Sequence, residues 1–192
     1  MDTVKLLKAI EERRNQAEKE AKVIVQILET QLCSMPEWKN QILSITYRIK
    51  EKRSIAEKIE YLKLHYPEKT DLEILDWIKD IIGITIETKE LADHVYVQLA
   101  LEKVIKQLKI EKCDFIDRLN IAGVTGFRAQ QLYFKPIEGI PYEIQITDTK
   151  NIQIRESTHE AFKNEKYKAI RFPNNTEKKE KIEKEQGEIG EK

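Results

Sequence analysis

Four closely spaced residues, Arg48, Lys50, Ser54 and Lys58, form a ladder that could bind a polyanion. Arg48 and Lys50 alternate along a segment of strand-like composition, so their side chains point to one face. Ser54 and Lys58 are four residues apart and share one face of a predicted helix. The N-terminus of that helix also attracts anions. The combination predicts a site for a polyphosphate such as the triphosphate of ATP.

Two acidic residues each adjoin an apolar run that is typical of a buried strand. Asp80 precedes a run rich in isoleucine, and Glu143 opens the segment 143–146, which reads E-I-Q-I. A carboxylate beside a buried strand is costly unless it is paired or bound to a metal. Glu143 and Gln145 should project from one strand face, with the intervening isoleucines facing the core. Two such carboxylates on neighbouring strands could hold Mg²⁺.

Each of these features also has a simpler interpretation. Charged residues make up 35% of the chain, so the ladder could be the solvated start of a basic helix. Asp80 could end a helix, and Glu143 could occupy an edge strand. The sequence has no glycine-rich phosphate-binding loop of the Walker or dinucleotide-binding type. The common phosphate-binding loops are therefore excluded.

The spacing of apolar residues predicts an α+β protein, with helices first and then a small sheet flanked by helices. Helices are predicted at 2–32, from 36 to about 43, at 54–65, 71–78, 91–108 and 152–168. Strands are predicted at 45–47, 81–88, 127–134 and 141–147, the last two as a hairpin, whereas 112–120 is ambiguous. Ser54 is a candidate N-cap, with Glu57 at capping-box spacing.

Composition narrows the class of protein further. The 192 residues contain 34 Lys and Arg and 34 Asp and Glu, so net charge gives no argument for or against nucleic acid. Cys33 and Cys113 lack metal-ligand spacing and are predicted to be reduced, as in a cytoplasmic protein. The sequence shows neither a membrane span nor a signal peptide, so we expect no membrane partner. His94 is predicted to lie on a helix surface.

Three regions are predicted along the chain. Residues 1–44 should form helices that pack on the core, and residues 45–172 should form the main domain. Residues 173–192 are rich in Glu and Lys and poor in apolar residues, which favours a disordered tail.

Taken in order, these segments resemble the synthetase domain of the RelA/SpoT family, which makes the (p)ppGpp alarmones. The resemblance runs from about residue 47 to about 168. The family's R-x-K-x-x-x-S-x-x-x-K motif is complete in the ladder 48–58. Its D-I-x-G-x-R motif reads D-I-I-G-I-T at 80–85, with Thr85 in place of arginine. Its E-I-Q-I-R-T strand reads E-I-Q-I-T-D at 143–148, with Thr147 in place of arginine.

The acceptor-binding motifs match less well. The family's N-G-Y-R-S-L-H element reads T-G-F-R-A-Q-Q at 125–131. Phe127 keeps an aromatic ring without the hydroxyl, and Gln131 replaces the histidine. The family's H-x-x-Y-K element corresponds to His159, Phe162 and Lys163.

The resemblance implies a nucleotidyltransferase-like, mixed five-stranded sheet flanked by helices, with the N-terminal helical extension of single-domain small alarmone synthetases. It implies that the ladder 48–58 binds ATP, and that Asp80 and Glu143 are catalytic and hold Mg²⁺, the expected cofactor. It assigns the acceptor to Phe127, Arg128, Gln145, His159 and Lys163. The family moves the β,γ-pyrophosphate of ATP to a ribose 3′-hydroxyl. The family's His-Asp hydrolase pair is absent from the sequence.

The acceptor itself stays open at this stage. GDP or GTP is the first expectation, which would make the protein a (p)ppGpp synthetase. The 3′ end of tRNA is the alternative, because R-E-S-T-H at 155–159 is similar to K-E-x-T-H in toxic members of the family. Such toxins bind an antitoxin, whereas other small synthetases form homo-oligomers. A catalytically inactive nucleotide-binding or interaction module is the third alternative.

Overall fold

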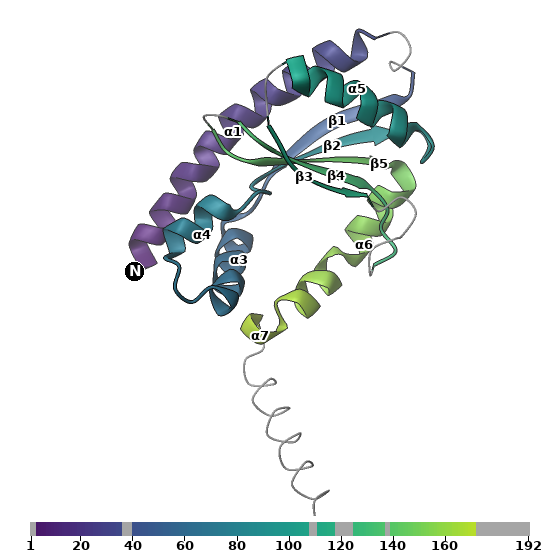
Figure 1. Ribbon diagram of the computed structural model, residues 1–192. Helices are drawn as coiled ribbons and strands as arrows, with labels where there is room; N and C mark the ends of the chain where they lie inside the picture. Colours follow the sequence, from purple (N-terminus) through teal and green to yellow (C-terminus); the bar gives the residue numbers. More distant parts are fainter. Residues whose placement is uncertain (1–2, 36–39, 108–110, 118–124, 137–138, 172–192) are drawn as a thin grey trace, which may run out of the picture.

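The computed structural model describes residues 3–35, 40–107, 111–117, 125–136 and 139–171 (Figure 1). The helices are α1 (Thr3–Cys33), α3 (Lys52–His65), α4 (Asp71–Trp77), α5 (Asp93–Gln107), α6 (Thr149–Lys166) and α7 (Lys168–Arg171). The strands are β1 (Ile42–Ile49), β2 (Ile82–Thr88), β3 (Glu111–Asp117), β4 (Gln130–Lys135) and β5 (Tyr142–Asp148).

The strands form one mixed sheet in the order β1-β2-β5-β4-β3. β2 and β5 run parallel, whereas β1 with β2, β4 with β5 and β3 with β4 run antiparallel. The predicted β4–β5 hairpin is therefore confirmed. This five-stranded sheet with flanking helices and an N-terminal helix confirms the predicted α+β fold class.

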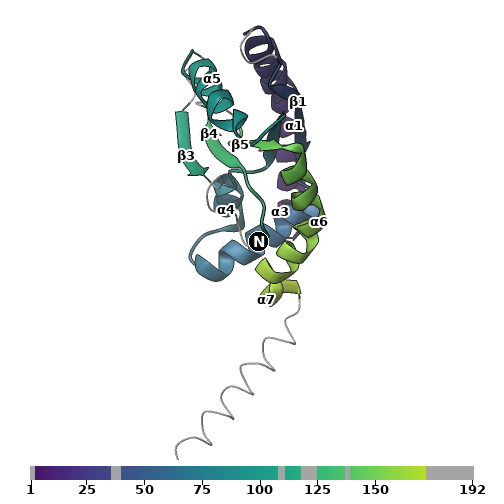
Figure 2. The same cartoon turned by 90° about the vertical axis from the view of Figure 1, so that its right-hand side faces the viewer.

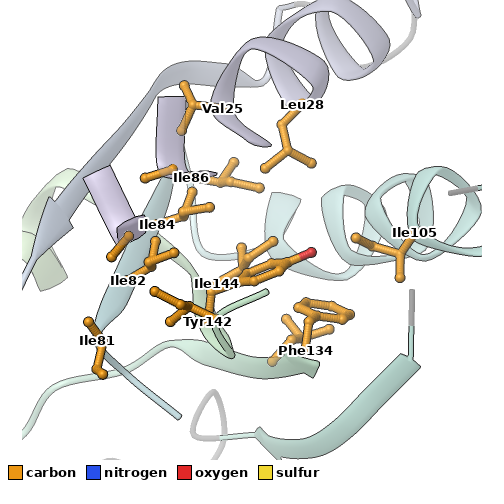
Figure 3. Close-up of a cluster of buried hydrophobic side chains, with 14 of the residues drawn as sticks. Val25, Leu28, Ile81, Ile82, Ile84, Ile86, Ile105, Phe134, Tyr142 and Ile144 are labelled. Carbon is orange, nitrogen blue, oxygen red and sulfur yellow. The ribbon is translucent and has the colours of Figure 1, made fainter. Parts of the chain in front are cut away.

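The alternation of residues along the strands gives the sheet one apolar face and one polar face. Isoleucines at alternate positions of β2 and β5 are fully buried beside Phe134 of β4. Val25 and Leu28 of α1 and Ile105 of α5 close over this face (Figure 3). The neighbouring positions 83, 85, 143 and 145 point to the opposite face. Burial of the isoleucine face thus fixes the direction in which the candidate site residues point.

The remaining helices gather on the polar face and at one end of the sheet. Figure 2 shows α3, α6 and α7 there, with α7 beside α3. Arg171 of α7 donates from Nε (3.2 Å) and Nη2 (2.7 Å) to the carboxylate of Glu57 in α3. Lys163 of α6 donates to Oγ of Ser54 in α3 at 3.1 Å. These contacts join the C-terminal helices to the helix that carries half of the cationic ladder.

Several local predictions are wrong. Ser54 is not an N-cap, because α3 begins two residues earlier after Glu51 and buries Ser54 inside the helix. Glu57 pairs with Arg171 and Arg53 instead of closing a capping box. The second predicted helix cannot reach residue 43, because β1 already begins at Ile42.

His94 is also misplaced by the sequence prediction, since it is buried at 0% exposure in the first turn of α5. Neither of its ring nitrogens has a hydrogen-bond partner. Cys33 is a free thiol, as predicted. The predicted tail 173–192, the start of the second helix at 36–39 and the side chain of Cys113 lie outside what the structure describes.

Candidate active site

A pocket with a volume of about 410 Å³ opens on the polar face of the sheet. It collects residues from β1, α3, β3, β4, β5 and α6, together with Asp80 just before β2, and these segments are far apart in the sequence. The sequence-predicted site residues that line it are Arg48, Lys50, Lys58, Asp80, Phe127, Glu143, Gln145, His159 and Lys163. The tertiary structure therefore brings together the three cations of the ladder, both acids and most of the predicted acceptor residues.

Asp80 lies between two lysines of the ladder. Lys50 Nζ is 2.8 Å from Oδ2, and Lys58 Nζ is 2.6 Å from Oδ1. Burial by itself would raise the pKa of Asp80, but the charges and hydrogen bonds of the two lysines outweigh it and hold that pKa well below its usual value. Asp80 is therefore ionised at neutral pH and already sits where a polyphosphate would meet the lysines.

Arg48 lies across the sheet over Gly83, its partner on β2. A Cβ atom at position 83 would be 3.3 Å from Arg48 Nε and 3.4 Å from its Cγ. Glycine at this position leaves room for the arginine side chain to lie flat on the strand. Because Gly83 also pairs with Glu143, Arg48 and Glu143 flank the same row of the sheet.

Glu143 is 4% exposed, yet it faces the pocket from β5. Gln131 Nε2 donates to its Oε1 at 2.7 Å, and the hydroxyl of Tyr133 donates to the same oxygen at 3.0 Å. Both donors come from β4, the strand beside β5. Two donors on one oxygen fix the orientation of the carboxylate and leave Oε2 for a ligand.

Two predicted site residues do not line the pocket. Ser54 lies behind its wall, where its hydroxyl accepts from Lys163. Arg128 is tied through its backbone, since its amide donates to Asn151 and its carbonyl accepts from the Thr147 hydroxyl. Ser54 therefore positions a pocket lysine, whereas Arg128 anchors the loop that carries Phe127.

The structure also places residues in the pocket that the sequence did not single out as site residues. Arg155 of α6 donates from Nη1 to Gln145 Oε1 at 2.9 Å and to Thr85 Oγ1 at 3.3 Å. Lys166 lies over the rings of Tyr61, Phe162 and Tyr167. Helical spacing from His159 could have drawn attention to Arg155, because the two are four residues apart on α6.

Burial and cation density shift the titration of the helix residues that face the pocket. Burial, reinforced by Lys163 and Arg48, lowers the pKa of His159, so its imidazole is neutral at pH 7. Burial, followed by the charge of Lys58, lowers the pKa of Lys166. Cations that lie close together repel one another, and a bound anion relieves this repulsion. The pocket is therefore suited to an anionic ligand.

The donor chemistry of the pocket fits Mg²⁺. Asp80 and Glu143 offer carboxylate oxygens to one cavity, and Mg²⁺ is usually bound by one or two carboxylates together with substrate phosphates. Among the described residues, no cluster of three or more His, Cys, Asp or Glu could enclose a metal. Two carboxylates beside a wall of cationic side chains are thus an arrangement that fits a metal that arrives with a nucleotide.

Comparisons with known proteins support the fold. No protein-family model and no curated protein match the sequence. Among solved structures, the small alarmone synthetase 1 from Bacillus subtilis is 19% identical, with a TM-score of 0.60 over 93% of this chain and 94% of that one. A GTP pyrophosphokinase family protein from Streptococcus pneumoniae is 21% identical, with a TM-score of 0.60 over 93% of this chain and 91% of that one.

These matches cover nearly the whole length of both chains. The chain therefore has the fold of the small alarmone synthetases, and the resemblance seen in its motifs is confirmed at the level of the fold. Within the described residues, no helix combines the length and apolar character needed to cross a membrane.

Proposed function

We propose that this protein is an ATP-dependent pyrophosphokinase that transfers the β,γ-pyrophosphoryl group of ATP to a ribose 3′-hydroxyl of GDP or GTP. The observation that carries the proposal is the convergence of the three cations of the ladder and two carboxylates in one pocket. Arg48, Lys50, Lys58, Asp80 and Glu143 all line it. Two solved structures of the small alarmone synthetase 1 from Bacillus subtilis are described as bound to its product pppGpp and to AMPCPP.

In this proposal the ladder binds the triphosphate. Lys50 and Lys58 would exchange contacts with Asp80 for contacts with phosphate oxygens, and Arg48 would bind them from the floor of the pocket over Gly83. Guanidinium and ammonium groups form strong charge-assisted hydrogen bonds to phosphate. This binding positions the β-phosphorus and offsets the charge that develops on the transferring group.

The chemical step is an in-line displacement. The oxygen of the acceptor 3′-hydroxyl attacks the β-phosphorus of ATP and forms a new P–O bond. The bond between the β-phosphorus and the oxygen that bridges it to the α-phosphorus breaks, and AMP leaves with that oxygen. Glu143, oriented by Gln131 and Tyr133, accepts the hydroxyl proton. Asp80 and Glu143 would hold Mg²⁺, which supplies charge neutralisation on the phosphates.

A product assay tests this function. Purified protein is incubated with Mg²⁺ and ATP labelled on the γ-phosphate, separately with GDP, GTP, an adenosine nucleotide and deacylated tRNA. We expect label on the guanosine nucleotide and one AMP released per transfer. ATP consumed to ADP and phosphate would contradict the proposal, and ATP not consumed at all would favour the inactive module.

The 3′ end of tRNA is a second candidate acceptor. Arg155 belongs to the segment R-E-S-T-H, which is similar to the K-E-x-T-H motif of toxic members of the family. Its side chain lines the pocket. Label on tRNA with none on the nucleotides would select this candidate. Growth arrest on expression, relieved by a neighbouring antitoxin gene, would accompany it.

A further inference from the structure

Arg155 lies directly above the strand position where the motif departs from the family pattern. Thr85 occupies the place of the arginine in D-I-x-G-x-R, yet a guanidinium still covers this part of the sheet. Nη1 of Arg155 is 3.3 Å from Thr85 Oγ1 and 2.9 Å from Gln145 Oε1. The charge that β2 lacks at position 85 is thus supplied by α6, from 70 residues further along the chain.

Arg155 forms no ion pair among the described residues, although the charges of Glu156 and Glu143 act on it from further away. Its hydrogen bonds go to a hydroxyl and an amide oxygen. Lys50 and Lys58 share Asp80, and Arg171 is paired with Glu57. A half-buried guanidinium that lines an open pocket and has no ion-pair partner is suited to an anionic ligand.

Arg48 is a second arginine of the pocket without an ion-pair partner among the described residues. Burial and then the charge of Arg48 lower the pKa of Arg155, so the two guanidinium groups influence each other across the floor. Two arginines held close together over a polar sheet are stabilised when a phosphate lies between or beside them.

The sheet register places Arg155 on one side of Glu143, the candidate base. Arg48, Gly83 and Glu143 form one row across the sheet, and Thr85 and Gln145 belong to the next row of that face. Asp80 precedes β2, so it lies on the other side of the Glu143 row. Successive rows on one face are about 7 Å apart. Arg155 therefore lies beyond Glu143 when viewed from the donor lysines.

We propose that Arg155 binds a phosphate group of the acceptor, next to the ribose that receives the pyrophosphoryl group. The inference rests on the proposed function, because it needs a donor side and an acceptor side. The phosphate belongs either to a guanosine nucleotide or to the 3′-terminal backbone of tRNA. The chemistry that Arg155 recognises is the same in both.

The test separates binding of the acceptor from binding of ATP. Steady-state constants are measured for Arg155→Ala and Arg155→Lys, with both acceptors. Lys150→Ala is the matched control, because Lys150 is an exposed cation on the same helix. We expect Arg155→Ala to raise the KM of the true acceptor at least about tenfold, which corresponds to roughly 1.4 kcal/mol. The KM of ATP should change less than about twofold, since Lys50 and Lys58 remain.

A second variant guards against a purely structural effect. In Thr85→Arg combined with Arg155→Ala, the guanidinium returns from β2, and we expect part of the acceptor affinity to return with it. An unchanged acceptor KM in Arg155→Ala would overturn the proposal. An equal rise in the KM of ATP and of the acceptor would overturn it as well.

Failure of the proposed function remains distinguishable from failure of this inference. If the wild-type protein transfers no pyrophosphate, equilibrium binding of GDP and of deacylated tRNA is compared between wild type and Arg155→Ala. At least about tenfold weaker binding by the variant would support the phosphate contact without turnover. Equal binding, or no binding of either probe by the wild type, would refute it.

Discussion

The side-chain amide of Gln131 donates a 2.7 Å hydrogen bond to Oε1 of Glu143. Gln131 occupies the position of a histidine in the family motif. From the sequence alone, this replacement is a departure from the motif that binds the acceptor. In the structure Gln131 is a partner of the candidate base instead. The contact pairs neighbouring strands, because Gln131 lies opposite Gln145 and Tyr133 lies opposite Glu143. β4 therefore holds the carboxylate that β5 presents.

Glu143→Gln should abolish turnover while the fold stays intact. The amide keeps the size of the side chain but cannot accept the hydroxyl proton or bind a metal as a carboxylate does. We expect kcat to fall at least about 100-fold, the lower range for removal of a general base. Glu156→Gln, an exposed acid on α6, is the control and should retain wild-type kcat. Near-normal activity of Glu143→Gln would remove Glu143 from the mechanism.

Asp80→Asn should lower both activity and stability. Lys50 and Lys58 would lose the shared carboxylate and repel each other, at a cost of roughly 1.5–3 kcal/mol in the free energy of unfolding. Urea denaturation with and without pyrophosphate measures the effect. Because pyrophosphate can replace the missing anion, it should stabilise Asp80→Asn more than wild type. Equal stabilisation of the two proteins would mean that the lysines do not form the anion site.

Gly83→Ala should weaken ATP binding through Arg48. The added methyl would lie 3.3 Å from Arg48 Nε, so the arginine must shift by a few tenths of an ångström. Since small displacements of positioning groups are costly, we expect the KM of ATP to rise roughly two- to tenfold. In an Arg48→Ala background, the same methyl should have no further effect on this KM. A rise of the same size in both backgrounds would show that Gly83 acts independently of Arg48.

His94 should make the protein less stable in mild acid. Burial lowers its pKa in the folded state below the ordinary value of 6.5, so the unfolded chain binds the proton more readily. The free energy of unfolding therefore falls as pH drops below about 6.5, by up to 1.4 kcal/mol for each unit of lowering. Denaturation curves at pH 7.5 and 5.5 measure this loss.

Replacement of the buried imidazole should remove part of that acid sensitivity. In His94→Leu the difference in unfolding free energy between pH 7.5 and pH 5.5 should shrink, whatever the absolute stability of the variant. His65→Gln, a change at an exposed histidine, should keep the wild-type difference. If both variants kept it, His94 would not be the group that responds to acid.

Arg171→Met should loosen the C-terminal helices. Arg171 donates to Glu57 through two nitrogens and to Glu160 at 2.7 Å. Without these contacts, we expect faster amide hydrogen exchange in α6 and α7, with little change in β2 and β5. Lys168→Met, on the same short helix and paired only with nearby Glu165 among the described residues, is the control. Unchanged exchange in α6 would show that Arg171 does not hold the helix in place.

The sequence by itself determined the elements and the face on which the chemistry lies. Helical and strand periodicities are local, so the long first helix, the isoleucine-rich strands and the shared face of Glu143 and Gln145 could all be read from spacing. The donor ladder is equally local, because Arg48 to Lys58 span a strand and the next helix. The burial of His94 escaped prediction because histidine is polar, although Val97 and Leu101, three and seven residues further along α5, lie on the same buried side of the helix.

Only the tertiary structure decided the contacts between distant segments. Arg155 reaches Thr85, Lys163 reaches Ser54, and Arg171 reaches Glu57, across 70, 109 and 114 residues. Such pairs depend on strand order and on where a helix returns over the sheet, and no local pattern specifies either. The motifs therefore predicted which residues could act, whereas the parallel pairing of β2 with β5 decided which of them meet.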